Sequence, residues 1–357
     1  MSVAINSIGS KYPHPVGGAL LPIVQRAGRR PTESQVEIGL LDERVEVRRA
    51  WAERMDFTPT PEQIERGLTD SQWGIRATWA KRKDFTPTPE QVERGLTDTE
   101  WGVRCAWVKR TDYLPTPEQI SRGLADPHVS VVISWVQRMD FTPTPEQIEK
   151  GLTHHDWCVR EYWMRRKGFT PTPEDIERGL TDLHWAVRDA WAKRTDFLPT
   201  PEQVERGLKD ESEWVRCTWA QRTDWSPTHE QIEMGLSDVH ATVRMAWAQR
   251  RDFTPTYKHI ERGLKDKYEN VRLAWAERDD YLAHPKQIKR GMKDSNLNVR
   301  AAWILRKDVF PSPTDIQKGL NHRDHKLRKA WADKLASMYE NDIETAQDTC
   351  MSDLSTL

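Results

Sequence analysis

The sequence has almost no net charge and no long apolar run. Lys and Arg together number 54 and Asp and Glu 55, so the formal net charge is −1. Cationic and acidic side chains are therefore mixed over the surface, which disfavours a polycation that binds phosphate backbones. No stretch of about 18 apolar residues exists, and the short apolar segment 19–24 is broken by a proline. We expect a soluble protein without a membrane-spanning helix.

Cysteine is also scarce, with four residues at positions 105, 158, 217 and 350. Cys105 and Cys217 occupy the same position of a repeated pattern, four repeats apart. If helix layers stack at roughly 8–10 Å, these two thiols are too far apart for a disulfide. Reduced thiols predict a cytoplasmic, intracellular protein. Residues 1–31 contain no acid, as in some bacterial secretion signals, so export as an effector is the alternative.

No fingerprint of an enzyme is present. The chain lacks G-x-S-x-G, H-E-x-x-H, the phosphate-binding loop and the dinucleotide-binding motif. No nucleophilic side chain has an evident base beside it in the sequence. We therefore predict a protein that is not an enzyme, with no catalytic residue and no cofactor.

One polar row, at the expected starts of successive helices, raises the question of a metal. The row consists of Glu100, His128, Asp156, His184, Ser212 and His240. Neighbouring repeats lie on the order of 10 Å apart, whereas a zinc ligand atom lies about 2 Å from the metal. Only the consecutive His154, His155 and Asp156 could bring ligands together. We expect a solvated polar row and no metal site.

The dominant feature of the sequence is a period of 28 residues. Tryptophan recurs at this interval at positions 51, 79, 107, 135, 163, 191, 219, 247, 275, 303 and 331. Self-similarity at a period of this size is typical of repeat proteins, whose units contact mainly their neighbours. We predict an irregular leader or cap at 1–31, a solenoid of eleven helix pairs at 32–334, and an acidic tail at 335–357.

Each repeat contains signals for two short helices. Thr60-Pro61-Glu62-Gln63 is a capping box, so the first helix should begin at Pro61. The second helix should run from about Ser71 to Lys83, with Ile75 and Trp79 on its apolar face. Gly67, which recurs in all eleven repeats, is expected to let another backbone approach closely. Helices this short need stacking on their neighbours for stability.

The segment Leu264–Ala276 carries the pattern L-x-D-x-x-x-x-V-R-x-A-x-A, which resembles the second half of a HEAT-type repeat. The same pattern recurs at Leu68–Ala80, Leu180–Ala192 and Leu236–Ala248. The resemblance implies an all-α, right-handed solenoid of antiparallel helix pairs, with the second helices lining a concave face. The recurrent Trp and the uniform FTPTP linker depart from the family pattern. Members of the family mostly bind proteins, and some related solenoids bind nucleic acid.

The resemblance also implies hydrogen bonds between the Asp and Arg of this motif in neighbouring repeats. They map onto the series beginning Asp42, Asp70, Asp98 and the series beginning Arg48, Arg76, Arg104. We expect the Arg of one repeat to pair with the Asp of the next, so Arg104 should bond Asp126 and not Asp98. Val132 and His154 replace both partners of a single junction, which we predict to be looser or bent.

Function should lie where the repeats differ. With Ile75 and Trp79 facing the core, positions 73, 77 and 81 of the second helix should point to the concave face. The first row of this face carries Trp73, Trp101, Trp157 and Trp185, and the third carries Lys81, Lys109, Arg165 and Lys193. Exposed aromatic residues beside cations are typical of binding hot spots. The alternative interpretation is that each Trp packs against the adjacent repeat.

We therefore predict a repeat scaffold that binds a protein partner in a groove centred on repeats two to six. The predicted contact residues are the Trp and cationic residues of these two rows, together with His128 and His184. The partner should present an acidic or extended segment, and no membrane is involved. The alternative is a solenoid that binds nucleic acid through the same stripe of Trp, Lys and Arg.

Overall fold

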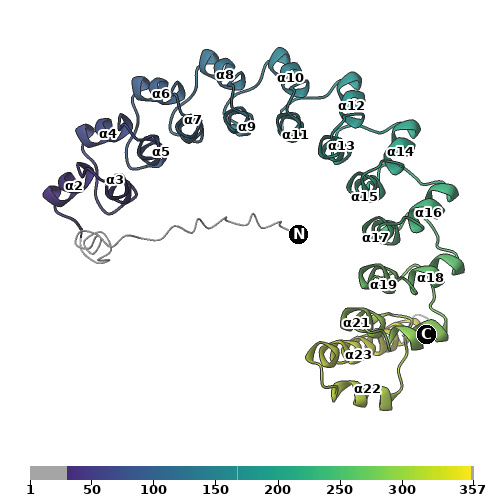
Figure 1. The fold of residues 1–357 in the computed structure, drawn as a ribbon. Coiled ribbons are helices and arrows are strands. Elements are labelled where there is room, and N and C mark those ends of the chain that lie inside the picture. Colours follow the sequence, from purple (N-terminus) through teal and green to yellow (C-terminus); the bar gives the residue numbers. More distant parts are fainter. Residues whose placement is uncertain (1–29, 167, 355–357) are drawn as a thin grey trace. The chain divides into compact units, whose positions relative to one another are not determined.

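The computed structural model describes residues 30–166 and 168–354, with side chains described up to Tyr339. These residues form 22 helices and no strand. The helices alternate between a first and a second helix of each 28-residue repeat, in two layers (Figure 1). The prediction of an all-α solenoid of helix pairs is therefore confirmed. The leader predicted at 1–31 lies almost entirely outside the described residues.

By their contacts the helices group into two units, Met1–Gly168 and Phe169–Leu357. The helices of the first unit, which contains repeats one to five, are α2 (Glu33–Leu40), α3 (Val45–Ala52), α4 (Pro61–Leu68), α5 (Trp73–Lys81), α6 (Pro89–Leu96), α7 (Trp101–Val108), α8 (Pro117–Leu124), α9 (Val129–Gln137), α10 (Pro145–Leu152) and α11 (Trp157–Arg165).

The second unit contains repeats six to eleven. Its helices are α12 (Pro173–Leu180), α13 (Trp185–Ala192), α14 (Pro201–Leu208), α15 (Glu213–Gln221), α16 (His229–Leu236), α17 (Ala241–Gln249), α18 (Tyr257–Gly263), α19 (Glu269–Ala276), α20 (Pro285–Gly291), α21 (Leu297–Leu305), α22 (Pro313–Leu320) and α23 (His325–Leu354). The last helix continues through most of the predicted tail, and its Leu335 and Met338 pack against the core of the last repeats. No helix of the described chain is both long and apolar enough to cross a membrane.

The predicted capping box is present at the start of the first helices. In α4 the Gln63 N–H donates to Thr60 Oγ1 at 3.3 Å, and the Thr60 N–H donates to Gln63 Oε1 at 3.1 Å. The second helix is shorter than predicted at both ends, because Gln72 and Arg82 have extended backbone conformations. Asp70 accepts the Gln72 N–H at 2.8 Å, which fixes the bend before α5.

The repeated glycine has a different role from the one predicted. A Cβ atom added to Gly67 would overlap the indole ring of Trp79, which is 1% exposed. The corresponding glycine faces the corresponding Trp in all eleven repeats. Gly67 therefore makes room for a side chain of its own repeat, and not for another backbone. Only glycine at position 67 leaves enough space between the two helices for the indole of Trp79.

A buried arginine that the sequence analysis did not single out joins consecutive repeats. Arg278 is 0% exposed, and its Nη1 donates to the carbonyls of Ala248 at 2.9 Å and Arg250 at 2.6 Å. Its Nη2 donates to the Phe253 carbonyl at 3.2 Å, and its Nε donates to Asp280 at 2.9 Å. The same arrangement is made by Arg82, Arg110, Arg138, Arg222, Arg250 and Arg306. The sequence signal is an Arg-x-Asp triplet that follows the repeated Trp in all repeats except the fifth and the eleventh.

Arg166 departs from this arrangement because Gly168 stands where its carboxylate partner would be. Arg166 still donates to the carbonyls of Val136, Arg138 and Phe141, but its Nε is buried without a hydrogen-bond partner. Burial without a carboxylate lowers the pKa of this guanidinium. Gly168 has a φ of 107°, a backbone conformation that favours glycine. The division between the two units falls at this residue.

Candidate partner-binding face

Ion pairs between consecutive repeats hold the second helices that carry the candidate face. Arg104 binds Asp126 of the next repeat through Nε and Nη2, both at 2.7 Å, as predicted. Its Nη1 donates to the Asp98 carbonyl at 2.8 Å, so Arg104 bonds to the backbone of Asp98 and not to its carboxylate. These hydrogen bonds to Asp126 raise the pKa of Arg104. Among the described residues, the same pair joins consecutive repeats at Arg48–Asp70, Arg76–Asp98, Arg104–Asp126, Arg188–Asp210, Arg216–Asp238, Arg244–Asp266 and Arg272–Asp294.

The junction between repeats four and five, where both partners of the ion pair are replaced, contains an open space. A cavity of about 760 Å³ lies there, lined by Val132, His154 and neighbouring residues. The equivalent hollow beside the intact pair Arg48–Asp70 has a volume of about 10 Å³. The ion pair therefore closes the gap between repeats, and its loss leaves the gap open.

The four tryptophans of the predicted row all retain exposed surface. Trp73 is 51% exposed, Trp101 45%, Trp157 37% and Trp185 41%. Two of them also pack on the next repeat. The Trp73 ring lies over Gly102, where an added Cβ would be 3.1 Å from Cζ3, and the Trp101 ring stacks on His128 with centroids 4.1 Å apart. The rings of Trp73 and Trp101 are therefore supported on one side by the next repeat and exposed on another.

Several residues in the middle row of the predicted face are buried. Ala77 is 5% exposed, and its equivalents Cys105 and Asp189 are 8% and 6% exposed. Asp189 accepts a hydrogen bond from Thr218 Oγ1 of the next repeat at 2.6 Å. Position 77 faces the neighbouring second helix, because second helices of consecutive repeats pack side by side. The face is narrower than predicted and consists of the rows through positions 73 and 81.

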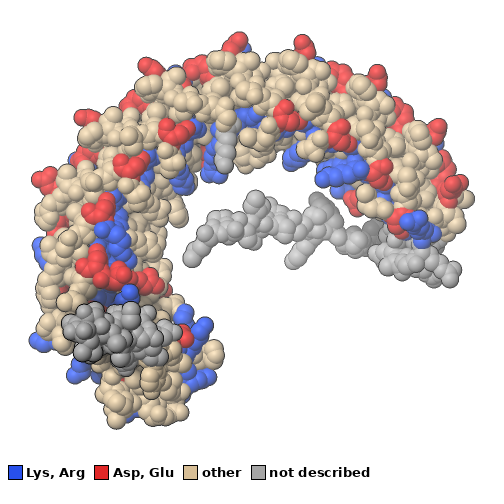
Figure 2. All heavy atoms as spheres, turned by 180° about the vertical axis from the view of Figure 1, so that it is seen from behind, with Lys and Arg blue, Asp and Glu red and all other residues tan. Residues whose placement is uncertain are grey.

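The cations of the row through position 81 differ in how far their charge is neutralised. Lys81 and Lys109 are exposed and form no ion pair with any described residue. Arg165 binds Glu161 at 2.5 Å, and Lys193 binds Asp189 at 2.5 Å, each on its own helix. In Figure 2, Lys and Arg gather on the second-helix layer, whereas Asp and Glu stand out along the first-helix layer. Within this row, the cations without an ion pair to a described residue are therefore those of repeats two and three.

His128 and His184 have a structural role at the starts of α9 and α13. The Nδ1 of His128 accepts the Ser130 N–H, and that of His184 accepts the Ala186 N–H, both at 3.3 Å. Both side chains are half-buried. Among the described residues, no three His, Cys, Asp or Glu side chains lie close enough together to hold a metal. Cys105, Cys158 and Cys217 are free thiols, and Cys350 lies beyond the described side chains.

One exposed tryptophan lies outside the predicted row. Trp214, in α15, is 53% exposed. It stands one position after the row that begins at Trp73, which in its own repeat is occupied by Glu213. The sequence signal for this residue is visible only when neighbouring positions of the second helix are compared between repeats.

Comparison with known proteins adds little to this description. No model of a known protein family matches the chain, and no curated protein matches it. A solved structure described as a leucine-rich repeat variant with a novel repetitive structural motif is similar, with 25% sequence identity and a TM-score of 0.43. The similarity covers 60% of this chain and 80% of that chain. By its own helices, the chain is a helical repeat protein.

Proposed function

We propose that the chain is a non-enzymatic scaffold that binds a protein partner through the exposed face of its second helices. The observation that carries the proposal is the pair of supported, half-exposed rings of Trp73 and Trp101 beside the uncompensated Lys81 and Lys109. A ring already held by Gly102 or His128 loses little conformational freedom on binding. Trp in such a position is typical of interface hot spots.

The charge of the face indicates the chemistry of the partner. Two lysines without acidic partners favour a segment rich in Asp and Glu, because opposite charges speed the encounter and select the partner. The adjacent indoles favour apolar side chains within the same segment. We therefore propose an acidic, extended segment with interspersed apolar residues. Within the first unit, Trp157 and Arg165 would extend the face, with less net charge because Arg165 is paired with Glu161.

Replacement of both Trp73 and Trp101 by alanine should weaken partner binding by at least about tenfold. The reason is that the substitutions remove two anchored rings from the centre of the face. The experiment is to capture partners on immobilised full-length protein and to measure affinity for the captured protein by calorimetry. Far-UV circular dichroism should show unchanged helicity, because neither ring belongs to the buried core.

Trp214→Ala is the matched control, since Trp214 is equally exposed but stands outside repeats two and three. This variant should bind like the wild-type protein. The double variant Lys81→Glu, Lys109→Glu keeps both rings and should also weaken the binding of an acidic partner. Equal binding by the wild-type protein and both double variants would contradict the proposal. Loss of helicity in the Trp double variant would instead assign the two rings to the core.

Single-stranded nucleic acid is the second candidate, because indoles interleaved with lysines also form a platform on which bases stack. The two candidates respond differently to salt. Affinity for nucleic acid falls steeply with added salt, by roughly one released counterion per phosphate contact. The affinity of an apolar protein interface falls far less when salt is added. The pairing of Arg165 and Lys193 with acids of their own helices favours the protein partner.

A further inference from the structure

The junction between repeats ten and eleven leaves an arginine without its carboxylate. At the preceding junction Arg272 binds Asp294 through Nε at 2.7 Å and Nη2 at 2.9 Å. Arg300 occupies the same position one repeat later, but His322 stands where the next Asp would be. The Nε of Arg300 is buried without a hydrogen-bond partner among the described residues. A buried guanidinium donor without an acceptor is costly, so this position favours an acceptor from elsewhere.

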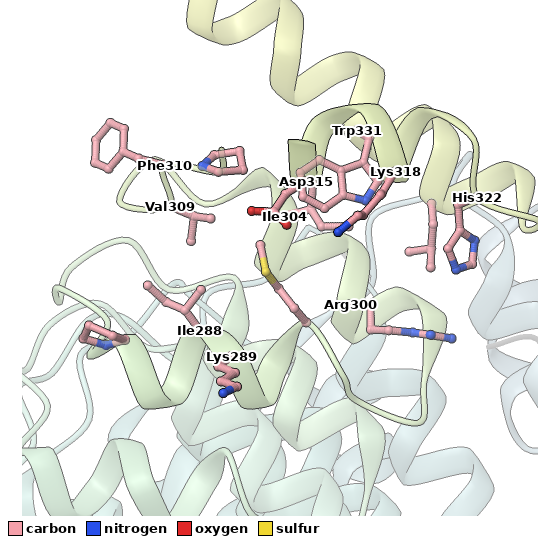
Figure 3. A pocket seen from close by; sticks show the side chains of 15 residues that line it. Ile288, Lys289, Arg300, Ile304, Val309, Phe310, Asp315, Lys318, His322 and Trp331 are labelled. Carbon is pink, nitrogen blue, oxygen red and sulfur yellow. The ribbon is translucent and has the colours of Figure 1, made fainter. Parts of the chain in front are cut away.

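Arg300 lines a cavity of about 510 Å³ between the two repeats. The hollow beside the intact pair Arg272–Asp294 has a volume of only about 10 Å³. Figure 3 shows Arg300 and His322 at the same end of the cavity, with the ring of Trp331 and the side chain of Ile304 toward its middle. Its apolar walls are formed by Ile288, Met292, Ile304, Val309, Leu327 and Trp331. A cavity of this size and composition is of the kind that holds a small organic molecule.

His322 provides a second donor at this end of the cavity. Its Nδ1 accepts the Asp324 N–H at 3.0 Å, so the neutral ring carries its hydrogen on Nε2. Arg300 has only donors, and the lysines of the lining, Lys289 and Lys318, also have only donors. Asp315 is the only acid of the lining, and its carboxylate already accepts from Ser312 Oγ at 2.6 Å at the start of α22. The polar part of the cavity therefore consists mainly of donors, and its one carboxylate is already bonded at the start of α22.

We propose that this cavity binds a carboxylic acid with an apolar or aromatic body. Its carboxylate would take the place of the absent Asp and accept from Arg300 and from His322 Nε2. Charge-assisted pairing of a guanidinium with a carboxylate is among the strongest polar contacts in proteins, and the same pairing joins consecutive repeats elsewhere in the described chain. The apolar body would contact Ile304, Leu327 and Trp331. The site is separate from the face formed by repeats two and three.

The test is a calorimetric titration of the full chain with 4-phenylbutanoate and, separately, with the uncharged 4-phenylbutan-1-ol. The acid should bind at least about tenfold more tightly than the alcohol. His322→Asp should reduce binding of the acid by about tenfold or more, because the new carboxylate pairs with Arg300 as Asp294 pairs with Arg272. This variant should fold, since it restores the pair found at the other closed junctions.

His154→Asp is the matched control, because the equivalent position in repeat four is Val132 and no guanidinium is available to pair with the new carboxylate. It should leave binding of the acid unchanged. The Arg300→Gln variant, which keeps His322, should no longer bind the acid. Equal binding of acid and alcohol, or binding that is unaffected by His322→Asp, would overturn the proposal.

A capped peptide, Phe-Glu-Phe, distinguishes the two sources of such a carboxylate. Tighter binding of 4-phenylbutanoate assigns the site to a free acid. Tighter binding of the peptide, again lost in His322→Asp, assigns it to the acidic side chain of a protein. Absence of binding by both probes would overturn the assignment of the cavity to carboxylates.

Discussion

Replacement of Gly67 by alanine should destabilise the first unit by about 3 kcal/mol or more. The added methyl group would overlap the indole of Trp79, which is 1% exposed. The indole cannot move aside easily, because the guanidinium of Arg82 lies 5.0 Å from its ring centroid on the buried side. Overpacking of this kind exceeds the gain in helix propensity that alanine brings over glycine. Urea denaturation followed by circular dichroism measures the loss.

Gly74→Ala is the matched control seven residues away in the same repeat. An added Cβ at Gly74 meets no atom within 4 Å, so this variant should gain up to about 1 kcal/mol from helix propensity. The two alanine variants should therefore change stability in opposite directions. A Gly67→Ala variant as stable as Gly74→Ala would contradict the assigned contact with Trp79.

Replacement of Arg278 by methionine should destabilise the second unit by about 3–5 kcal/mol. Methionine fills a similar volume but leaves the carboxylate of Asp280 and the carbonyls of Ala248, Arg250 and Phe253 without their donor. The substitution also removes the stacking of the guanidinium on the rings of Phe253 and Trp275. Urea denaturation should show the loss as a lower transition midpoint.

Arg278→Lys tests whether the forked shape of arginine matters. Lys334 stands at the equivalent position of the last repeat and donates from Nζ to the Arg306 carbonyl at 2.7 Å. A lysine at 278 should therefore keep one of these bonds and lose the others, with a stability between the wild-type protein and the methionine variant. A lysine variant as stable as the wild-type protein would show that charge alone suffices.

The features that were predictable from the sequence are those encoded within one repeat or by a simple rule between repeats. The capping box at Thr60 depends on residues three apart, and the pairing of Arg104 with Asp126 follows from a periodic motif. The roles of Gly67 and Arg278 were harder to predict from the sequence. Gly67 faces Trp79 across the two helices of one repeat, and burial of Arg278 runs against the usual preference of arginine for the surface. Neither contact is visible before the helices are placed.

The candidate face was predictable in part. The exposure of Trp73 and Trp101 depends on Gly102 and His128 of the following repeats, and these neighbours set how much of each ring stays open. The loss of position 77 from the face has the same origin, because this position faces the second helix of a neighbouring repeat. The cavity at Arg300 has a signal in the sequence. His322 replaces the Asp that pairs with the Arg of the preceding repeat, as His154 does at its own junction.

The central claim is that the second-helix face of repeats two and three holds the partner. Oxidative footprinting of the full chain, alone and with its captured protein partner, tests this claim most directly because it reports the exposure of each tryptophan. We predict that Trp73 and Trp101 become protected in the complex, while Trp214, which is 53% exposed in the free chain, remains as reactive as before. Protection of Trp214 with unchanged reactivity of Trp73 and Trp101 would contradict the account.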